Sequence, residues 1–205
     1  EIHSGTTDIL LSDNRCVGSY YNWLDTNSTT VGGAINLKCN NNIVNGAHNV
    51  AINLGLNTNF AAITNNSIHC GIGDTDNSSY TYLKAVSTGI EVQCYKAIVS
   101  QNNITNFSDC GIKLTQKYNA PTGASHRGTF SGGSTSSNQL WNTTRGLGLP
   151  SPLVIVSDNI IGGQSGNTGI SQVGIYIEPS VTPTSQYLKA TKICNNTITG
   201  VYSGI

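Results

Sequence analysis

Residues 99–104 read Val-Ser-Gln-Asn-Asn-Ile, and the same six-residue pattern returns five more times along the chain. Each copy has a hydrophobic residue, any residue, one of Asp, Asn or Gln, an unvarying Asn, any residue and a second hydrophobic residue. The copies begin at Leu11, Cys39, Ile63, Val99, Val156 and Ile193, and their unvarying residues are Asn14, Asn42, Asn66, Asn102, Asn159 and Asn196. Repetition at a variable spacing predicts a solenoid, because each unit then buries its apolar face against its neighbours.

A second pattern, a small residue followed by Ile, any residue and an aliphatic residue, alternates with the first at residues 51–54, 89–92, 111–114 and 174–177. Short β-branched runs precede the unvarying asparagines, and no segment has a sustained helical period. Successive copies of the first pattern are 24 to 57 residues apart, so the shortest spacing approximates one bare coil and the excess is inserted loop. Three short strands per coil, stacked in parallel at ~4.8 Å per rung, account for this spacing.

These two patterns resemble the right-handed parallel β-helix of the pectin-lyase-like superfamily over most of the chain. The resemblance implies an all-β solenoid of about six coils, with an Asn ladder at the turn between the second and third strands and the second pattern in the first strand. Asn suits that turn because it tolerates a left-handed backbone and its amide can bond to neighbouring rungs. Residues 34–37 lie too close to Cys39 to be a first strand, so we expect them in a second strand and expect residues 20–24 in the first.

Charged residues make up only 10% of the chain and the formal net charge is zero, which disfavours a nucleic-acid partner. No apolar stretch is long enough for membrane insertion. We expect residues 1–205 to form a single β-helix domain and to be a piece of a longer protein, since they open within a coil near residues 8–11 and stop as another copy of the second pattern begins.

The six cysteines include no C-x-x-C pair, and two of them, Cys16 and Cys39, occupy hydrophobic positions of the first pattern. We therefore expect free core thiols in preference to disulfides. Residues 74–77 have the oxygen-rich spacing of a calcium loop but lack the downstream Glu, so the sequence predicts neither a metal nor a cofactor.

The long insertions all flank the first strand of a coil: residues 116–151 follow one, and residues 71–88 and 162–173 precede one. Insertions of this length inside a compact repeat are usually functional. We therefore expect them to form the walls of a groove whose floor is the sheet of first strands, which is also where the resembled superfamily binds polysaccharides.

Alternation along the first strands places Glu91, Lys113 and Tyr176 in one outward column. Glu178 belongs to the next column, two rungs from Glu91, so we expect the two carboxylates to lie about 10 Å apart. That separation is compatible with a pair of catalytic carboxyls in an inverting glycosidase. A structural alternative is that Glu91 and Lys113 form an exposed cross-rung ion pair.

Three further residues are candidates for the same groove. Trp141 and Arg145, on the long insertion, offer a stacking face and a bidentate donor for sugar binding. Asp109 precedes a first strand at the edge of the groove and is a further candidate acid, although a turn residue there has an equally good structural reason.

Two hypotheses about function follow. Low charge, abundant Asn, Ser and Thr, and loops on one face resemble the bacteriophage tailspike depolymerases. The resemblance implies a glycoside hydrolase, or alternatively a polysaccharide lyase, that binds and cleaves a bacterial surface polysaccharide. It also implies a homotrimer at an extracellular or virion surface. The other hypothesis is a non-catalytic receptor-binding spike, adhesin or shaft. The N-T-D, G-H-G, R-I-K and R-x-P-x-x-R motifs of polygalacturonases and pectate lyases are missing, so their catalytic residues cannot be transferred.

Overall fold

The computed structural model describes residues 7–18, 22–26, 35–47, 49–55, 58, 60–70, 87–93, 96–115, 153–163, 172–178 and 191–205. Every regular element within these ranges is a β-strand, and the strands form three parallel sheets. The all-β, solenoid-like architecture that the repeat predicts is therefore confirmed. None of the described residues belongs to a helix long and apolar enough to span a membrane.

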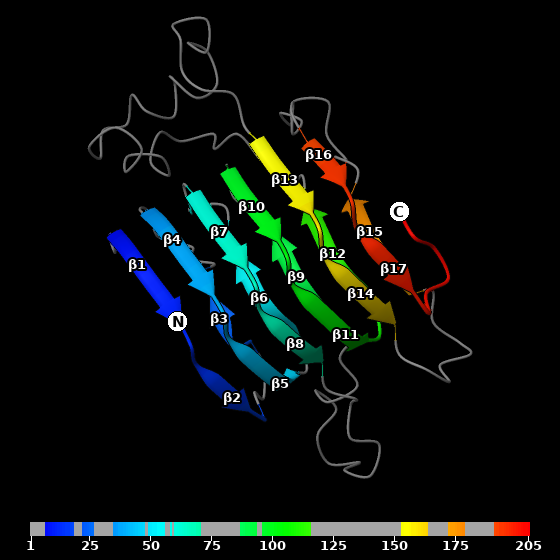
Figure 1. Cartoon of the computed structure of the whole chain (residues 1–205), viewed down its shortest axis with the longest axis horizontal. Coiled ribbons are helices and arrows are strands. Elements are labelled where there is room, and N and C mark those ends of the chain that lie inside the picture. Colours follow the sequence, from blue (N-terminus) through cyan, green and yellow to red (C-terminus); the bar gives the residue numbers. More distant parts are fainter. Residues whose placement is uncertain are drawn as a thin grey trace, which may run out of the picture.

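The first five turns of the chain each contribute one strand to each sheet, the last described turn contributes a strand to two of them, and neighbouring strands come from successive turns (Figure 1). Sheet A contains β1 (Thr7–Ser12), β4 (Ile35–Asn40), β7 (Phe60–Thr64), β10 (Lys96–Ser100), β13 (Leu153–Ser157) and β16 (Thr191–Cys194). Sheet B contains β2 (Arg15–Val17), β5 (Ile43–Ala47), β8 (Ser67–Cys70), β11 (Asn103–Phe107), β14 (Ile160–Gly163) and β17 (Thr197–Thr199). Sheet C contains β3 (Leu24–Asp25), β6 (Val50–Leu54), β9 (Thr88–Val92), β12 (Cys110–Thr115) and β15 (Val173–Glu178).

The earliest described turn differs from the prediction at its first strand. Residues 35–40 form a second strand as expected, but among the described residues 22–26 only Leu24 and Asp25 join sheet C, and residues 20 and 21 of the predicted strand lie outside the described residues. Asn22 precedes the strand because its side chain closes a corner: its Oδ1 accepts hydrogen bonds from the backbone N–H of Val50 and from Asn49 Nδ2, both at 3.2 Å.

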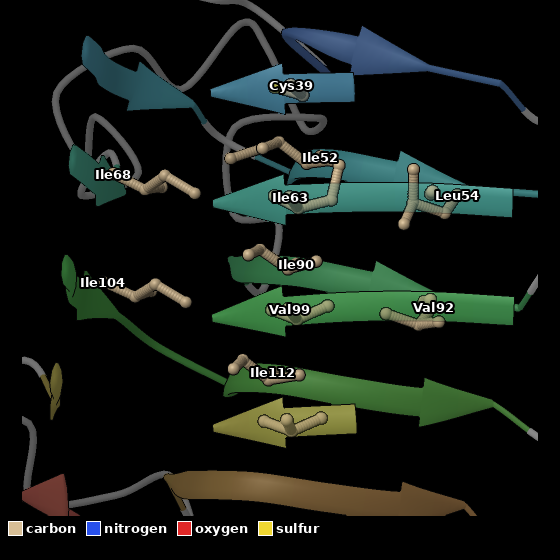
Figure 2. Packing of buried hydrophobic residues seen from close by; sticks show 14 of the residues in the cluster. Cys39, Ile52, Leu54, Ile63, Ile68, Ile90, Val92, Val99, Ile104 and Ile112 are labelled. Atoms are coloured by element: carbon tan, nitrogen blue, oxygen red, sulfur yellow. The ribbon is translucent and has the colours of Figure 1, made fainter. Parts of the chain in front are cut away.

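The core lies between the three sheets and consists of apolar residues stacked in register. Figure 2 shows Cys39, Ile63 and Val99 on successive strands, with Ile68 and Ile104 entering from a second sheet. These five side chains are fully buried. Stacking like on like explains why the hydrophobic positions of both sequence patterns recur in every turn.

The unvarying asparagines bond from turn to turn at the corner between sheets A and B. Asn102 donates from both its backbone N–H and its Nδ2 to Asn159 Oδ1, each at 3.0 Å, and its Nδ2 also donates to the carbonyl of Ile63 at 2.9 Å. Its own Oδ1 accepts from the N–H and Nδ2 of Asn66 at 3.0 and 2.9 Å. The same pair of bonds links Asn14 to Asn42, Asn42 to Asn66 and Asn159 to Asn196.

A left-handed backbone at this corner belongs to the residue before the unvarying Asn, so our assignment of it to the Asn itself is wrong. Positive φ angles of 54° to 60° occur at Asp13, Asn41, Asn65, Gln101, Asp158 and Asn195. Short polar residues tolerate this conformation. The finding explains why the third position of the pattern is Asp or Asn in five of the six copies; it does not account for Gln101.

The small residue of the second pattern is explained by close packing where sheet B turns into sheet C. A Cβ on Gly111 would lie 2.4 Å from Ile161 Cγ2 and 2.7 Å from the carbonyl oxygen of Gly174. Gly89 and Gly174 have the same surroundings, each 2.4 Å from the Cγ2 of an isoleucine in sheet B. The corner is therefore too tight for any side chain in these three turns.

Free thiols are confirmed for the five cysteines that the structure describes: Cys16, Cys39, Cys70, Cys110 and Cys194. Burial raises the pKa of the Cys39, Cys70 and Cys110 thiols to about 12. These three therefore act as small core residues and remain protonated at neutral pH.

Candidate functional site on the outward face of sheet C

The outward face of sheet C carries one column of polar side chains across five strands. The Cα register pairs Asp25 with Asn53, Asn53 with Glu91, Glu91 with Lys113, and Lys113 with Tyr176. Residues on either side of this column, such as Ile90, Val92 and Ile112, are buried in the core. The predicted alignment of Glu91, Lys113 and Tyr176 is thus present in the sheet.

Burial varies along the column. Tyr176 is 37% exposed, and Glu91 and Lys113 are half-buried. Asn53 is only 7% exposed although it lies between the inward-facing Ile52 and Leu54. Partly desolvated polar groups interact more strongly with a ligand than fully hydrated ones do.

The carboxylate of Glu91 is held by its own strand. Gln93 lies two residues further on, on the same side of the sheet, and its Nε2 donates to Glu91 Oε1 at 2.9 Å. The backbone N–H of Gln93 in turn donates to the carbonyl of Leu54 at 2.8 Å, which fixes Gln93 to the preceding rung. Glu91 is therefore oriented rather than free to swing, as a catalytic or ligand-binding carboxylate requires.

Asp25 and Asn53 extend the column at its other end, and the sequence analysis missed both. Asn53 Nδ2 donates to Asp25 Oδ1 at 3.2 Å, and Asn22 Nδ2 donates to Asp25 Oδ2 at 2.9 Å. Asn53 Oδ1 is buried and, within the described part of the chain, accepts no hydrogen bond. The signal was available, since Asn53 occupies the same position of the second pattern as Glu91.

Glu178 lies further from Glu91 than expected. It pairs with Thr115 and so lies two residues beyond Tyr176 as well as two rungs from Glu91. Rung and residue spacings in parallel sheets put the two Cα atoms about 12 Å apart, compared with the 10 Å that counting rungs alone gives. The side chain of Glu178 lies outside the described part of the structure.

Asp109 lies at the corner between β11 and β12, and its contacts there are those of a turn residue. Its Oδ2 accepts a hydrogen bond from the Thr88 hydroxyl at 3.3 Å, and its backbone N–H donates to the carbonyl of Ser87 at 3.0 Å. Its carboxylate also contributes to the raised pKa of the Cys110 thiol. These contacts favour the structural reading of Asp109.

Several sequence candidates lie outside the described residues: Trp141, Arg145, the oxygen-rich segment 74–77, and most of the insertions expected to wall the groove. Within the described ranges, no three His, Cys, Asp or Glu side chains gather to hold a metal ion. The column from Asp25 to Tyr176 is therefore the candidate site that the described structure brings together.

The chain matches no family model, no curated protein and no solved structure. The interpretation of the site therefore rests on its own geometry and chemistry.

Proposed function

We propose that the chain binds a bacterial surface polysaccharide along the outward face of sheet C. The observation that carries the proposal is the column of Asn53, Glu91, Lys113 and Tyr176 in register on adjacent strands. A row of carboxylate, ammonium, amide and aromatic groups suits an extended saccharide, which offers hydroxyls along its length and an apolar ring face for stacking.

We also infer the finer architecture: a right-handed parallel β-helix of about six coils with an Asn ladder at its second turn. Parallel strands joined by crossovers are right-handed in about 98% of cases. The amide bonds between successive unvarying asparagines support the ladder.

For cleavage, the proposal assigns Glu91 as a catalytic carboxyl and Glu178 as the second carboxyl, with Lys113 and Tyr176 binding the sugar. Glu91 is suited to proton transfer because it is half-buried and held by Gln93. In an inverting mechanism, one of the two carboxyls would protonate the glycosidic oxygen, and the other would activate water on the opposite face of the sugar.

A second candidate function, passive glycan binding by a spike or adhesin, is favoured by one observation. The Cα atoms of Glu91 and Glu178 are about 12 Å apart by strand geometry, whereas inverting glycosidases keep their carboxyls roughly 6.5–9.5 Å apart. Unless the side chains converge, Glu91 would hold a sugar rather than cleave it.

The test incubates the chain with a panel of bacterial capsular polysaccharides and lipopolysaccharides and follows released oligosaccharides. Glu91→Gln and Glu178→Gln should each abolish most turnover while glycan retention persists. Asp158→Asn is a matched control that also removes a carboxyl, at a turn position where Asn41, Asn65 and Asn195 serve in other copies. Binding without products would favour the passive spike, and unsaturated products would indicate a lyase.

We further propose an extracellular or virion-surface location and a homotrimer, as the likeness to tailspikes suggests. Most soluble homo-oligomers have closed point-group symmetry, and a cyclic trimer is one such arrangement. Light scattering on the purified chain tests this: a mass of three chains supports the trimer, and a stable monomer contradicts it.

A further inference from the structure

The amide of Asn53 has one half bonded and the other half without a partner. Its Nδ2 donates to Asp25 Oδ1 at 3.2 Å, while its Oδ1 is buried and accepts no hydrogen bond from any residue that the structure describes. The large majority of buried polar atoms in proteins have a partner, so an orphaned acceptor in an otherwise well-bonded sheet needs a physical account.

The orientation of this amide is not arbitrary. A carboxylate only accepts hydrogen bonds, so turning the amide over would bring Asn53 Oδ1 against Asp25 Oδ1 and leave two acceptors facing each other. Asp25 is held in turn by Asn22, whose Oδ1 receives hydrogen bonds from Val50 and Asn49. The chain of contacts from Asn22 through Asp25 therefore keeps Asn53 Oδ1 turned away from the Asp25 rung.

We propose that Asn53 Oδ1 is the acceptor of a carbohydrate subsite that takes a hydrogen-bond donor from the sugar, with Glu91 on the adjacent rung as a second acceptor. The inference rests on the proposed function and adds the subsite's chemistry to it. The sugar would supply the hydrogen-bond donor either from a hydroxyl or from the ammonium of an amino sugar. Asp25 is a positioning residue, since it acts by holding the Asn53 amide.

The variants Asn53→Leu and Asn53→Asp should rank in one order for stability and in the opposite order for polysaccharide affinity. Asn53→Leu removes the orphaned acceptor together with the bond to Asp25, so the denaturation midpoint should not fall. Asn53→Asp instead places a third carboxylate between those of Asp25 and Glu91 on successive rungs and should lower the midpoint. Affinity should instead fall from native to Asn53→Asp to Asn53→Leu, because the aspartate keeps an acceptor and the leucine has none.

The experiment is affinity electrophoresis of the full chain in gels containing dextran, hyaluronan, glycol chitosan or the capsular polysaccharides and lipopolysaccharides of the panel above. On whichever of these retain the native chain, Asn53→Leu should weaken retention at least tenfold. Asn45→Leu makes the same change at a half-buried outward position of sheet B and should leave retention unchanged. Asp25→Ala should weaken retention, and Asp25→Asn, which keeps an acceptor, should restore it.

The outcomes distinguish a hydroxyl donor from an ammonium donor. They also distinguish failure of the subsite from failure of the proposed function. Retention on dextran that is lost in Asn53→Leu identifies a hydroxyl, and retention confined to chitosan identifies an ammonium. Undiminished retention of Asn53→Leu, or affinity that follows the order of stability, overturns the subsite while polysaccharide binding stands. A native chain that no polysaccharide retains overturns the proposed function and the subsite with it.

Discussion

Asn102 and Asn53 carry the same amide in two regions of the molecule, and the two regions use it in opposite ways. At the corner between sheets A and B, Asn102 Oδ1 accepts two hydrogen bonds and its Nδ2 donates to three acceptors. On the outward face of sheet C, Asn53 donates to Asp25 and its Oδ1 accepts no hydrogen bond from the described residues. The difference follows from what lies on the neighbouring rungs.

At the corner, every turn places another Asn above and below, so each amide satisfies its neighbour. On the outward face the column reads Asp25, Asn53, Glu91, Lys113 and Tyr176, and no two successive rungs carry the same residue. Repetition therefore marks the residues that build the solenoid. Variation within a repeated position marks residues that the solenoid itself does not require, which is why we propose the ligand site there.

The largest effect on stability is expected for Asn102→Ala. The substitution removes the acceptor of the N–H and Nδ2 of Asn66 in a buried corner, and each buried unsatisfied group costs roughly 1–3 kcal/mol, so the loss should be roughly 2–6 kcal/mol. Asn103→Ala, at the exposed next residue, is the control and should change the unfolding free energy by less than about 0.5 kcal/mol. Equal denaturant midpoints for both variants would contradict the structural role of the corner.

A change of condition rather than of sequence, a rise to alkaline pH, should also destabilise the core. The folded pKa of Cys39, Cys70 and Cys110 is raised to about 12 from an ordinary value of 9.0, so their contribution is complete below pH 9 and is lost as the pH rises toward 12. Each thiol should remove roughly 1.4 kcal/mol per pH unit in that window. Urea unfolding at several alkaline pH values measures how steeply the unfolding free energy falls with pH. Cys70→Val should make this fall less steep, and an unaltered slope would mean that other groups cause the loss.

Gly111→Ala tests the corner between sheets B and C. Its Cβ would lie 2.4 Å from Ile161 Cγ2, and overpacking of this kind costs roughly 1–3 kcal/mol. Gly204 offers a matched control, because it occupies the same place in the pattern and a Cβ there meets nothing within 4 Å. Thermal unfolding of the two alanine variants should separate them clearly, and similar midpoints would show that the corner can widen.

Gln101→Gly should raise stability. Gln101 has a φ of 58°, a left-handed conformation that costs an L-residue roughly 1–2 kcal/mol and costs glycine almost nothing. Part of that gain is offset by the greater freedom of glycine in the unfolded chain, so we expect a net increase of about 0.5–1 kcal/mol. Ser100→Gly, in the extended strand before it, should be destabilising. A loss of stability in Gln101→Gly would mean that the side chain itself supports the corner.

The fold could be predicted from the sequence because its determinants repeat. The unvarying Asn and the hydrophobic positions on either side of it report the register of all three sheets, and the register in turn predicts that Glu91, Lys113 and Tyr176 share a column. The left-handed residue was misplaced by one position, because a pattern of adjacent polar residues does not say which of them carries the strained backbone.

The site was harder to predict for a different physical reason. Asn53 is distinguished by an amide oxygen that has no hydrogen-bond donor among the described residues, and such a deficit depends on side-chain orientation rather than on residue spacing. The separation of Glu91 from Glu178 was underestimated because rungs were counted without the offset along the strand. A repeat specifies where a residue lies, while function depends on what that residue is left to bond with.

Replacements of Lys113 and Tyr176 should have the smallest effect on stability, and they test the outward face most directly. Tyr176 is 37% exposed and Lys113 half-buried, and both side chains point away from the core, so Lys113→Gln and Tyr176→Leu should each change the unfolding free energy by less than about 0.5 kcal/mol. Lys38→Gln, on the exposed face of sheet A, is the control for removing a lysine. If the column binds a glycan, the two sheet C variants should lose polysaccharide retention while Lys38→Gln keeps it. A loss of more than about 2 kcal/mol in Lys113→Gln would instead make this column part of the structural support, as the corner asparagines are.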